Sequence, residues 1–393
     1  MLKRSFNCGN LTIYSIFQLS WNSFCFSLDN RDSISNHPVI MAENTIIRAS
    51  CNCRSSTFTF SVPTSSLPLP AYLCHCNISR RISGALCTSY VDIPLGLDDP
   101  KPDLTSLTPY RSSDILTRYF CPACGTQMYL KYFSDGHISV STGTLDRSDG
   151  FVQFLGHMWI QDTKDGGASD FIPTIRSEKL KRWLAEPGQG EEAPARWKST
   201  SSTPKPPSKT DKLYAHCHCG GVKFWISRPG EQSKKAESPF PDLLIPYHTN
   251  SPANPSNEPW WLPQEDRFLA GTCACMSCRE SSGFDITWWA FVPVSDITLE
   301  NGEPFRRYFG TQKTYRSSPH CTRTFCSRCG CTVFWDGDER PSLVDVALGL
   351  LDAESGTRAE EWLYYHQGRV SFTEFARHRE LITGLEEGLK AYR

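Results

Sequence analysis

Short stretches of alternating apolar and polar residues recur along the chain, at 58–62 (FTFSV), 222–226 (VKFWI), 286–294 (ITWWAFVPV) and 342–349 (SLVDVALG). Alternation with a period of two places one face of a strand against a core and the other toward solvent. Helical patterns are scarce: residues 177–186 predict a short helix capped by Ser177, and residues 373–393 predict an amphipathic helix used for packing or oligomerisation. The pattern therefore predicts a mainly β protein with little helix.

The cysteines expose an internal duplication, because the same four blocks occur twice in the same order. The first copy contains CNC at 51–53, CHCNISRRISG at 74–84, YRSS at 110–113 and RYFCPACGT at 118–126. The second copy contains CHCGG at 217–221, CACMSCRESSG at 273–283, YRSS at 315–318 and RTFCSRCGC at 323–331. Each copy then continues to a related tetrapeptide, GTLD at 143–146 or GLLD at 349–352. The chain contains one module twice.

A stretch rich in Pro, Ser, Lys and Glu separates the two copies and predicts a solvated linker. The predicted order is a disordered leader (1–44), a first domain (45–186), the linker (187–212), a second domain (213–371) and a helical tail (372–393). The second domain carries a Pro-rich insert at 228–266, which we interpret as a surface loop. Its Trp260 and Trp261 are expected to pack locally or to cover a nearby pocket.

Charge argues against a broad nucleic-acid or anionic membrane surface, since 41 Lys and Arg balance 42 Asp and Glu. Nowhere do about 18 apolar residues run together, so no membrane span is expected. Polar residues interrupt the apolar N-terminal stretch, which makes a secretory signal unexpected and favours a cytoplasmic or nuclear location. Most of the 18 cysteines stand in C-x-C or C-x-x-C pairs, which indicates metal binding and not disulfides.

Two distant cysteine pairs in each copy can form a four-thiolate site. Four thiolates make a closed tetrahedral zinc site that ties chain segments together and contributes to folding. The predicted structural ligands are Cys51, Cys53, Cys121 and Cys124 in the first copy, and Cys217, Cys219, Cys326 and Cys329 in the second.

The middle cluster of the second copy offers three thiols: Cys273, Cys275 and Cys278. Three protein ligands with one exchangeable position are the pattern of a catalytic or substrate-binding zinc, and zinc favours a soft incoming ligand such as a thiolate. One alternative is another structural zinc, completed by His320, Cys321 or Cys331. A second alternative is a redox C-x-x-C pair.

The first copy departs from this pattern, because Ser79 stands where Cys278 stands in the second copy. Cys74 and Cys76 remain, but a serine hydroxyl is a poor zinc ligand at neutral pH. A second three-ligand site is therefore expected to be weak or empty, and the first domain to be structural or a lid. His75 lies between the two cysteines and is expected to point the other way.

As a set, these motifs resemble the glutathione-dependent formaldehyde-activating enzyme family, also called the GFA or CENP-V domain, over about 48–165 and 214–370. The resemblance implies two β-tent domains. In the second it implies the four structural zinc ligands given above and a reactive zinc at Cys273, Cys275 and Cys278, where the thiol of glutathione binds.

The resemblance also implies an activity, that of a carbon–sulfur lyase that joins glutathione to formaldehyde or a similar carbonyl compound. The competing interpretation is a non-catalytic zinc-binding scaffold, of which some relatives act at chromatin; a redox or metal-buffering role is a third. Repeated polar residues could be turn or supporting residues, and no acid or base is predicted among them: Arg279, Ser282, Ser317, Ser318 and Arg323.

Overall fold

The alternating stretches form strands in the computed structural model, which describes residues 43–96, 99–200, 208–238, 250–264 and 266–392. Strands at all four predicted places are β2 (Thr57–Pro63), β14 (Lys223–Ser227), β16 (Thr287–Pro293) and β21 (Leu343–Ala347). The predicted leader lies outside the described residues except for positions 43 and 44.

The first repeat is built from three sheets, a small hairpin and one short helix, α1 (Asn77–Ser83). β1 (Asn44–Ser50) pairs with β2, and a five-stranded antiparallel sheet has the order β4-β8-β7-β6-β5. A three-stranded sheet has the order β12-β9-β3, and β10 pairs with β11. The remaining bounds are β3 (Leu69–Cys74), β4 (Tyr90–Asp92), β5 (Thr108–Arg111), β6 (Leu116–Phe120), β7 (Gln127–Tyr132), β8 (Ile138–Ser141), β9 (Val152–Met158), β10 (Thr174–Ile175), β11 (Glu178–Lys179) and β12 (Lys181–Arg182).

The second repeat has a four-stranded sheet, in the order β17-β14-β13-β22, and a seven-stranded sheet, in the order β18-β19-β20-β21-β16-β15-β23. Its short helix α2 (Met276–Ser282) follows the middle cysteines as α1 does in the first repeat. The mainly β prediction is confirmed. The remaining bounds are β13 (Lys212–His216), β15 (Phe268–Cys273), β17 (Ile297–Leu299), β18 (Gln312–Ser318), β19 (Cys321–Cys326), β20 (Thr332–Gly337), β22 (Leu351–Asp352) and β23 (Leu363–Tyr365).

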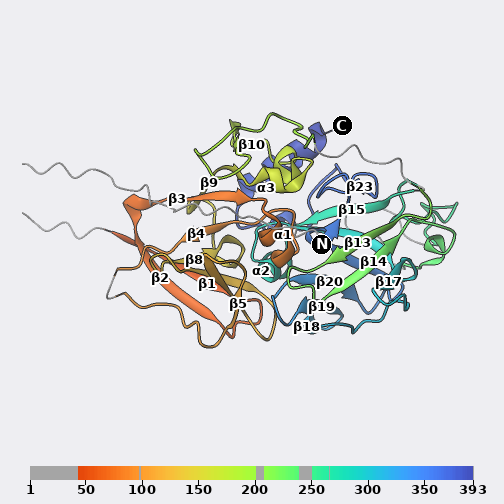
Figure 1. The fold of residues 1–393 in the computed structure, drawn as a ribbon, viewed down its shortest axis with the longest axis horizontal. Coiled ribbons are helices and arrows are strands. Elements are labelled where there is room, and N and C mark those ends of the chain that lie inside the picture. The colour runs from red at the N-terminus through yellow and green to blue at the C-terminus, as the bar shows by residue number, and fades with distance from the viewer. Residues whose placement is uncertain (1–42, 97–98, 201–207, 239–249, 265, 393) are drawn as a thin grey trace, which may run out of the picture. The chain divides into compact units, whose positions relative to one another are not determined.

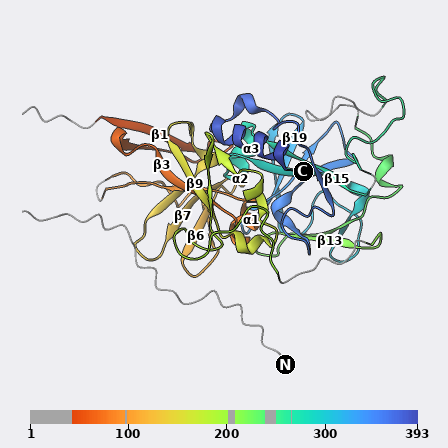
Figure 2. The same cartoon turned by 90° about the horizontal axis from the view of Figure 1, so that it is seen from above.

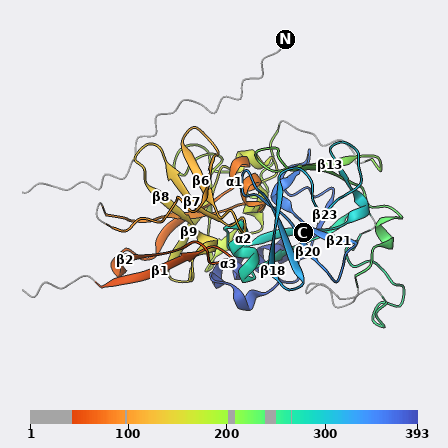
Figure 3. The same cartoon turned by 90° about the horizontal axis from the view of Figure 1, so that it is seen from below.

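Both repeats belong to one compact unit, Ala42–Arg393, and each holds the short helix of the other. Arg80 of α1 donates to the carbonyls of Gly349 and Leu351, both at 2.9 Å. Reciprocally, Arg279 of α2 donates to the carbonyls of Gly143 and Leu145. Figures 2 and 3 show the two helices between the orange-to-yellow strands of the first repeat and the green-to-blue strands of the second. The repeats therefore contact each other through equivalent, reciprocal contacts.

The glycines of the two related tetrapeptides are required by this contact. A Cβ on Gly143 would lie 2.3 Å from the backbone nitrogen of Phe284, and one on Gly349 would lie 2.4 Å from the carbonyl oxygen of Arg80. Such distances are too short for any side chain in a close-packed interface. The repeated GTLD and GLLD sequences thus mark the surface where the repeats meet.

The helix predicted at 177–186 is wrong. Arg176 and Ser177 have positive φ angles of 53° and 63°, so the chain turns sharply and β11 pairs back onto β10. β12 then pairs in parallel with β9, and Arg182 forms a buried ion pair with Asp170 at 3.0 Å. A pairing partner and a buried charge thus override the local helical pattern. Of the predicted linker, the part before 201 contacts the first repeat, for example where Ala193 N–H donates to the backbone carbonyl of Arg182 at 2.8 Å.

The predicted tail helix forms as α3 (Arg379–Ala391), preceded by a 3₁₀ turn at Thr373–Phe375. It packs against the first repeat of the same chain, beside β10, as the blue helix in Figure 1 shows. Gly384 and Gly388 allow this approach, since their Cβ positions would lie 2.2 Å and 2.1 Å from the carbonyl oxygens of Thr174 and Phe171. The C-terminal helical tail therefore connects the second repeat to the first by direct packing.

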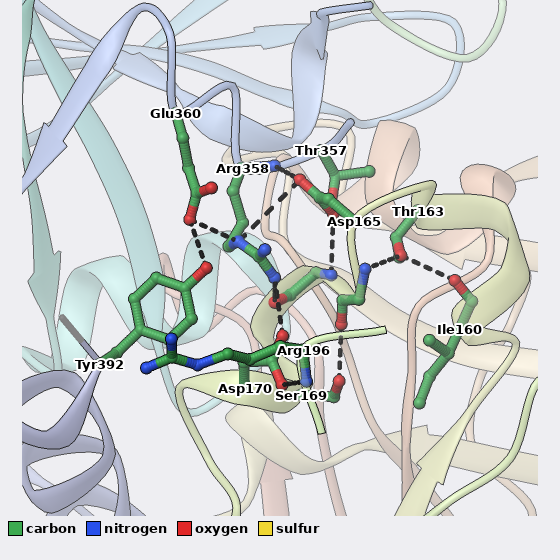
Figure 4. Close-up of polar contacts among 12 residues, drawn as sticks. Ile160, Thr163, Asp165, Ser169, Asp170, Arg196, Thr357, Arg358, Glu360 and Tyr392 are labelled. Atoms are coloured by element: carbon green, nitrogen blue, oxygen red, sulfur yellow. Dashed lines mark hydrogen bonds and ion pairs between the residues drawn. The ribbon is translucent and has the colours of Figure 1, made fainter. Parts of the chain in front are cut away.

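A buried ion network lies beside α3 and joins both repeats (Figure 4). Arg358 of the second repeat, fully buried, contacts Asp170 at 3.1 Å and Glu360 at 3.0 Å, and donates to the carbonyl of Gly167 at 2.9 Å. Its backbone N–H donates to Asp165 at 2.7 Å. Burial raises the pKa of Asp165, while the nearby Arg358 opposes that rise. The network therefore places opposite charges of the two repeats next to each other in a buried position.

Asp296 is a buried carboxyl in the second repeat whose pKa burial raises to about 6. Ionising it in the folded state costs free energy, so stability is expected to fall as pH rises from about 4 to 6. Asp296→Asn should therefore raise the free energy of unfolding at pH 8, by an upper bound of about 3 kcal/mol, and this gain should vanish below about pH 4. Urea unfolding at both pH values tests this, and an equal gain at both would contradict it.

Candidate active site

Each repeat brings the four predicted structural thiols together. The sulfurs of Cys51, Cys53, Cys121 and Cys124 lie within 4.8 Å of one another, and so do those of Cys217, Cys219, Cys326 and Cys329. In each repeat the first pair follows an N-terminal strand, β1 or β13. The second pair lies where β6 or β19 ends and in the turn that follows, with Cys326 as the last residue of β19. Four convergent thiols are a donor set that fits tetrahedral zinc.

Backbone N–H groups point at these sulfurs at equivalent places in the two repeats. The N–H of Ser56 lies 3.3 Å from Cys51 Sγ, and the N–H of Val222 lies 3.3 Å from Cys217 Sγ at the equivalent place. Hydrogen bonds with Cys217 hold the pKa of Cys326 far below its usual value, while hydrogen bonds with neighbouring thiols raise the pKa of Cys217 and of Cys329. The thiols are therefore close enough to shift one another's pKa values, and cysteine binds metal as the thiolate.

The middle cluster of the second repeat also converges, with Cys273, Cys275 and Cys278 all within 4.8 Å. Cys273 ends β15, and the Cys275 sulfur caps α2 by accepting from the N–H of Cys278 at 3.4 Å. A hydrogen bond from Cys273 lowers the pKa of Cys275 strongly, although burial opposes this.

No fourth His, Cys, Asp or Glu of the described residues joins these three thiols. His320 and Cys321, two of the predicted candidates, line a neighbouring cavity outside the cluster. Cys331 is buried and its thiol donates to the carbonyl of Thr332 at 3.3 Å. Within the described chain, the cluster therefore has three protein sulfurs and an adjoining cavity.

Arg323 is the residue that sequence reasoning left undecided and that the structure places on the cluster. Its Nη2 lies 3.2 Å from Cys278 Sγ and 2.9 Å from Ser277 Oγ, and its Nε donates to Ser317 at 3.2 Å. Burial lowers its pKa, but Cys278 and Cys275 outweigh burial and raise it overall. The sequence contained a signal for this pair, because the repeated YRSS and R-x-F-C blocks each carry its serine or its arginine in both copies.

The first repeat keeps the same frame with serine in place of the third cysteine. Arg118, equivalent to Arg323, donates to Ser79 at 3.0 Å, to Ser112 at 3.2 Å and to the Tyr90 hydroxyl at 2.6 Å. The Cys74 thiol lies 3.5 Å from the Ser79 hydroxyl. The His75 side chain bonds to His157 at 2.9 Å.

A cavity of about 370 Å³ adjoins the three-cysteine cluster. Besides the thiols and Arg323, its wall is rich in aromatic side chains: Trp260, Trp289, Phe291, Trp335 and Phe372. Trp260 comes from the Pro-rich insert, so that insert does cover a pocket. The adjacent Trp261 packs locally and donates to the carbonyl of Ser233 at 3.0 Å.

Three buried polar atoms of residues that line this cavity have no hydrogen-bond partner among the described residues. They are Arg323 Nη1, Thr272 Oγ1 and Trp260 Nε1, on side chains that are 3%, 4% and 1% exposed. Buried polar groups are normally hydrogen-bonded, and each lone group needs an explanation. A polar ligand bound in the neighbouring cavity would supply the partners of these three atoms.

Two four-thiol clusters, one three-thiol cluster and a cavity beside it define a tandem metal-binding β protein. The family model for the glutathione-dependent formaldehyde-activating enzyme matches residues 46–162 and 264–367, more than half of the chain. The chain belongs to this family. A search of curated proteins gives no match.

A structural-genomics crystal structure of a Rhodobacter sphaeroides protein is similar at 15% identity, covering 36% of this chain and 88% of that chain, with a TM-score of 0.21. That likeness is too low to support an argument about fold or function. Among the described residues, no helix has the length and apolar character needed to cross a membrane.

Proposed function

We propose that this protein is a zinc-dependent enzyme of the carbon–sulfur lyase type, which adds a small thiol such as glutathione to formaldehyde or a similar carbonyl compound, or releases it. The observation that carries the proposal is the three-thiol cluster, which lies against a cavity and is joined by no fourth protein sulfur among the described residues. The two four-thiol clusters would hold structural zinc. We further propose a cytoplasmic or nuclear location.

Zinc bound by Cys273, Cys275 and Cys278 would accept a thiol sulfur and lower its pKa. In the addition, the sulfur forms a bond to the carbonyl carbon, the C=O π electrons move to oxygen, and the thiol proton ends on that oxygen. Negative charge therefore develops on oxygen next to the cluster. Arg323 Nη1, which has no partner among the residues that the structure describes, is suited to stabilise it, since a preorganised donor in a buried site costs little reorganisation.

The first repeat would support the second and not share the reaction. Its Arg118 has all three guanidinium nitrogens bonded, and Ser79 replaces the third thiol. Its reciprocal contact through Arg80 and its contacts with α3 hold the second repeat in place.

The direct test is the rate of formaldehyde consumption by zinc-loaded protein with and without glutathione. A rate above the uncatalysed reaction, present only with thiol, is expected. A rate equal to the uncatalysed one with every small thiol tried would contradict the proposal, and salt-sensitive DNA binding would then support the scaffold interpretation.

Arg323→Gln is expected to lower kcat/KM about 10- to 100-fold, because side chains that hold a metal's ligands typically have effects of this size. Arg118→Gln at the equivalent place in the first repeat is the matched control and should leave kcat/KM unchanged. Steady-state kinetics with thermal melts of both variants separate chemistry from stability. Equal losses in the two variants would show that the arginine acts only through folding.

A further inference from the structure

The two repeats differ at the position that decides whether the arginine is available to a ligand. Cys74 pairs with Thr88 across its sheet, and Cys273 pairs with Thr287 in the same way. Two residues beyond each threonine stand Tyr90 in the first repeat and Trp289 in the second. The Tyr90 hydroxyl bonds to Arg118 Nη1 at 2.6 Å, whereas Trp289 lines the cavity and Arg323 Nη1 has no partner among the described residues.

A second difference along the same strands places an aromatic residue where the first repeat has a charged one. Four residues beyond the paired threonines stand Asp92 and Phe291. Asp92 accepts a hydrogen bond from Ser139 at 2.6 Å, while Phe291 lies in the cavity wall with its ring 5.0 Å from that of Trp260. The insert that supplies Trp260 has no counterpart of similar length in the first repeat. Thus Phe291 and Trp260 have no aromatic counterpart in the first repeat, and Trp289 stands where the first repeat has Tyr90.

The cavity is larger and more aromatic than formaldehyde needs. About 370 Å³ falls in the range of pockets that hold molecules of drug size, which are lined mainly by apolar and aromatic groups with a few polar ones. Of the cationic side chains in its wall, Arg340 is paired with Asp345 at 2.5 Å, which leaves the partly bonded guanidinium of Arg323 to face the two carboxylates of glutathione. The buried Trp260 Nε1 has no partner within the described parts of the chain and marks a place for an acceptor atom.

We propose that the cavity selects a thiol adduct that carries a planar aromatic group, held among Trp260, Trp289 and Phe291. This inference rests on the proposed function and names its substrate class. The aromatic group can come from either reactant, as in R–SH + R′CHO → R–S–CH(OH)–R′, where the S–C bond forms and the thiol proton ends on the former carbonyl oxygen. Aromatic rings favour offset or edge-on contacts with other rings, which this wall provides.

The test compares three reactant pairs on zinc-loaded protein: phenylmethanethiol with formaldehyde, glutathione with benzaldehyde, and glutathione with formaldehyde as reference. One of the first two pairs should exceed the reference in kcat/KM by about tenfold or more, and which one does so identifies the source of the ring. Calorimetric binding of phenylmethanethiol, of glutathione and of benzaldehyde provides a readout independent of turnover.

Trp289→Tyr recreates the first repeat's arrangement, so its hydroxyl should pair with Arg323 and the aromatic preference should fall about tenfold in kcat/KM and in binding. Trp261→Phe, in the same insert but outside the cavity, is the matched control and should keep the preference. If Trp289→Tyr does not fold, Trp335→Leu, on the half-buried part of the wall, replaces it and should lose the preference likewise.

A reference pair that equals or exceeds both aromatic pairs overturns this inference and leaves the proposed function standing. A preference that survives both Trp289→Tyr and Trp335→Leu also overturns it. Absence of thiol-dependent turnover in all three pairs, together with no binding of either thiol, would overturn the proposed function itself.

Discussion

Replacing Cys278 by serine is expected to remove one zinc per chain and to abolish thiol-dependent turnover, while the fold is retained. The substitution leaves two thiols, Cys273 and Cys275, and recreates the pattern that the first repeat carries with Ser79. A serine hydroxyl stays protonated near neutral pH and competes poorly as a zinc ligand. The two four-thiol clusters are separate and should keep their zinc, so the melting temperature should change little.

The measurement is zinc per chain by elemental analysis, beside thiol-dependent turnover. Cys321→Ser is the matched control, because Cys321 lines the same cavity and lies outside the cluster; its zinc content should equal that of the unmodified protein. Full turnover in Cys278→Ser would contradict the mechanism. Loss of zinc in Cys321→Ser would show that this thiol completes the site.

The reverse exchange extends this prediction to the first repeat. Ser79 occupies the same place on α1 as Cys278 on α2, its N–H donates to Cys76 Sγ at 3.3 Å, and Arg118 contacts its hydroxyl as Arg323 contacts the Cys278 thiol. Ser79→Cys should therefore add one zinc per chain. An unchanged zinc content would mean that serine is not what distinguishes the two clusters.

Arg358→Met is expected to destabilise the folded chain by about 3–5 kcal/mol, because removing one partner of a buried ion network leaves its counter-charges uncompensated. The fully buried guanidinium lies near Asp165 and Asp170 of the first repeat and Glu360 of the second (Figure 4). Asp170 keeps its pair with Arg182 at 3.0 Å, but Asp165 loses its cation. The loss should fall on the contact between the repeats.

Urea unfolding at neutral pH measures this loss. Arg316→Met removes an exposed arginine paired with Asp338 at 2.8 Å and serves as the matched control; no measurable change is expected, since exposed pairs are screened by solvent. A loss in Arg358→Met no larger than that of the control would show that the network does not join the repeats.

Composition and spacing were enough to predict the β class, the duplication and all three thiol clusters. The cysteines recur as C-x-C and C-x-x-C pairs in the same order in both copies, which makes each cluster recognisable. Composition and spacing were not enough for residues 177–186, where a turn with positive φ and the buried pair of Arg182 with Asp170 outweigh a helical pattern. Such partners lie far away in sequence, so local periodicity carries no trace of them.

The residues around the thiol cluster could not be assigned from the sequence either. Arg279 and Arg323 occur in equally conspicuous repeated blocks, yet Arg279 anchors α2 to the first repeat while Arg323 contacts the Cys278 thiol. Trp260 and Trp261 are neighbours with equal burial, but only Trp260 lines the cavity. Which of two similar residues faces the site depends on strand register and packing, which spacing alone does not give.

The most direct test of the central claim is the zinc content of protein purified anaerobically without chelator, counted with and without glutathione. Two four-thiol clusters and one three-thiol cluster predict three zinc ions per chain, with one of them altered in its exchange rate by glutathione. Two zinc ions per chain, both indifferent to glutathione, would contradict the account, because Cys273, Cys275 and Cys278 would then hold no metal.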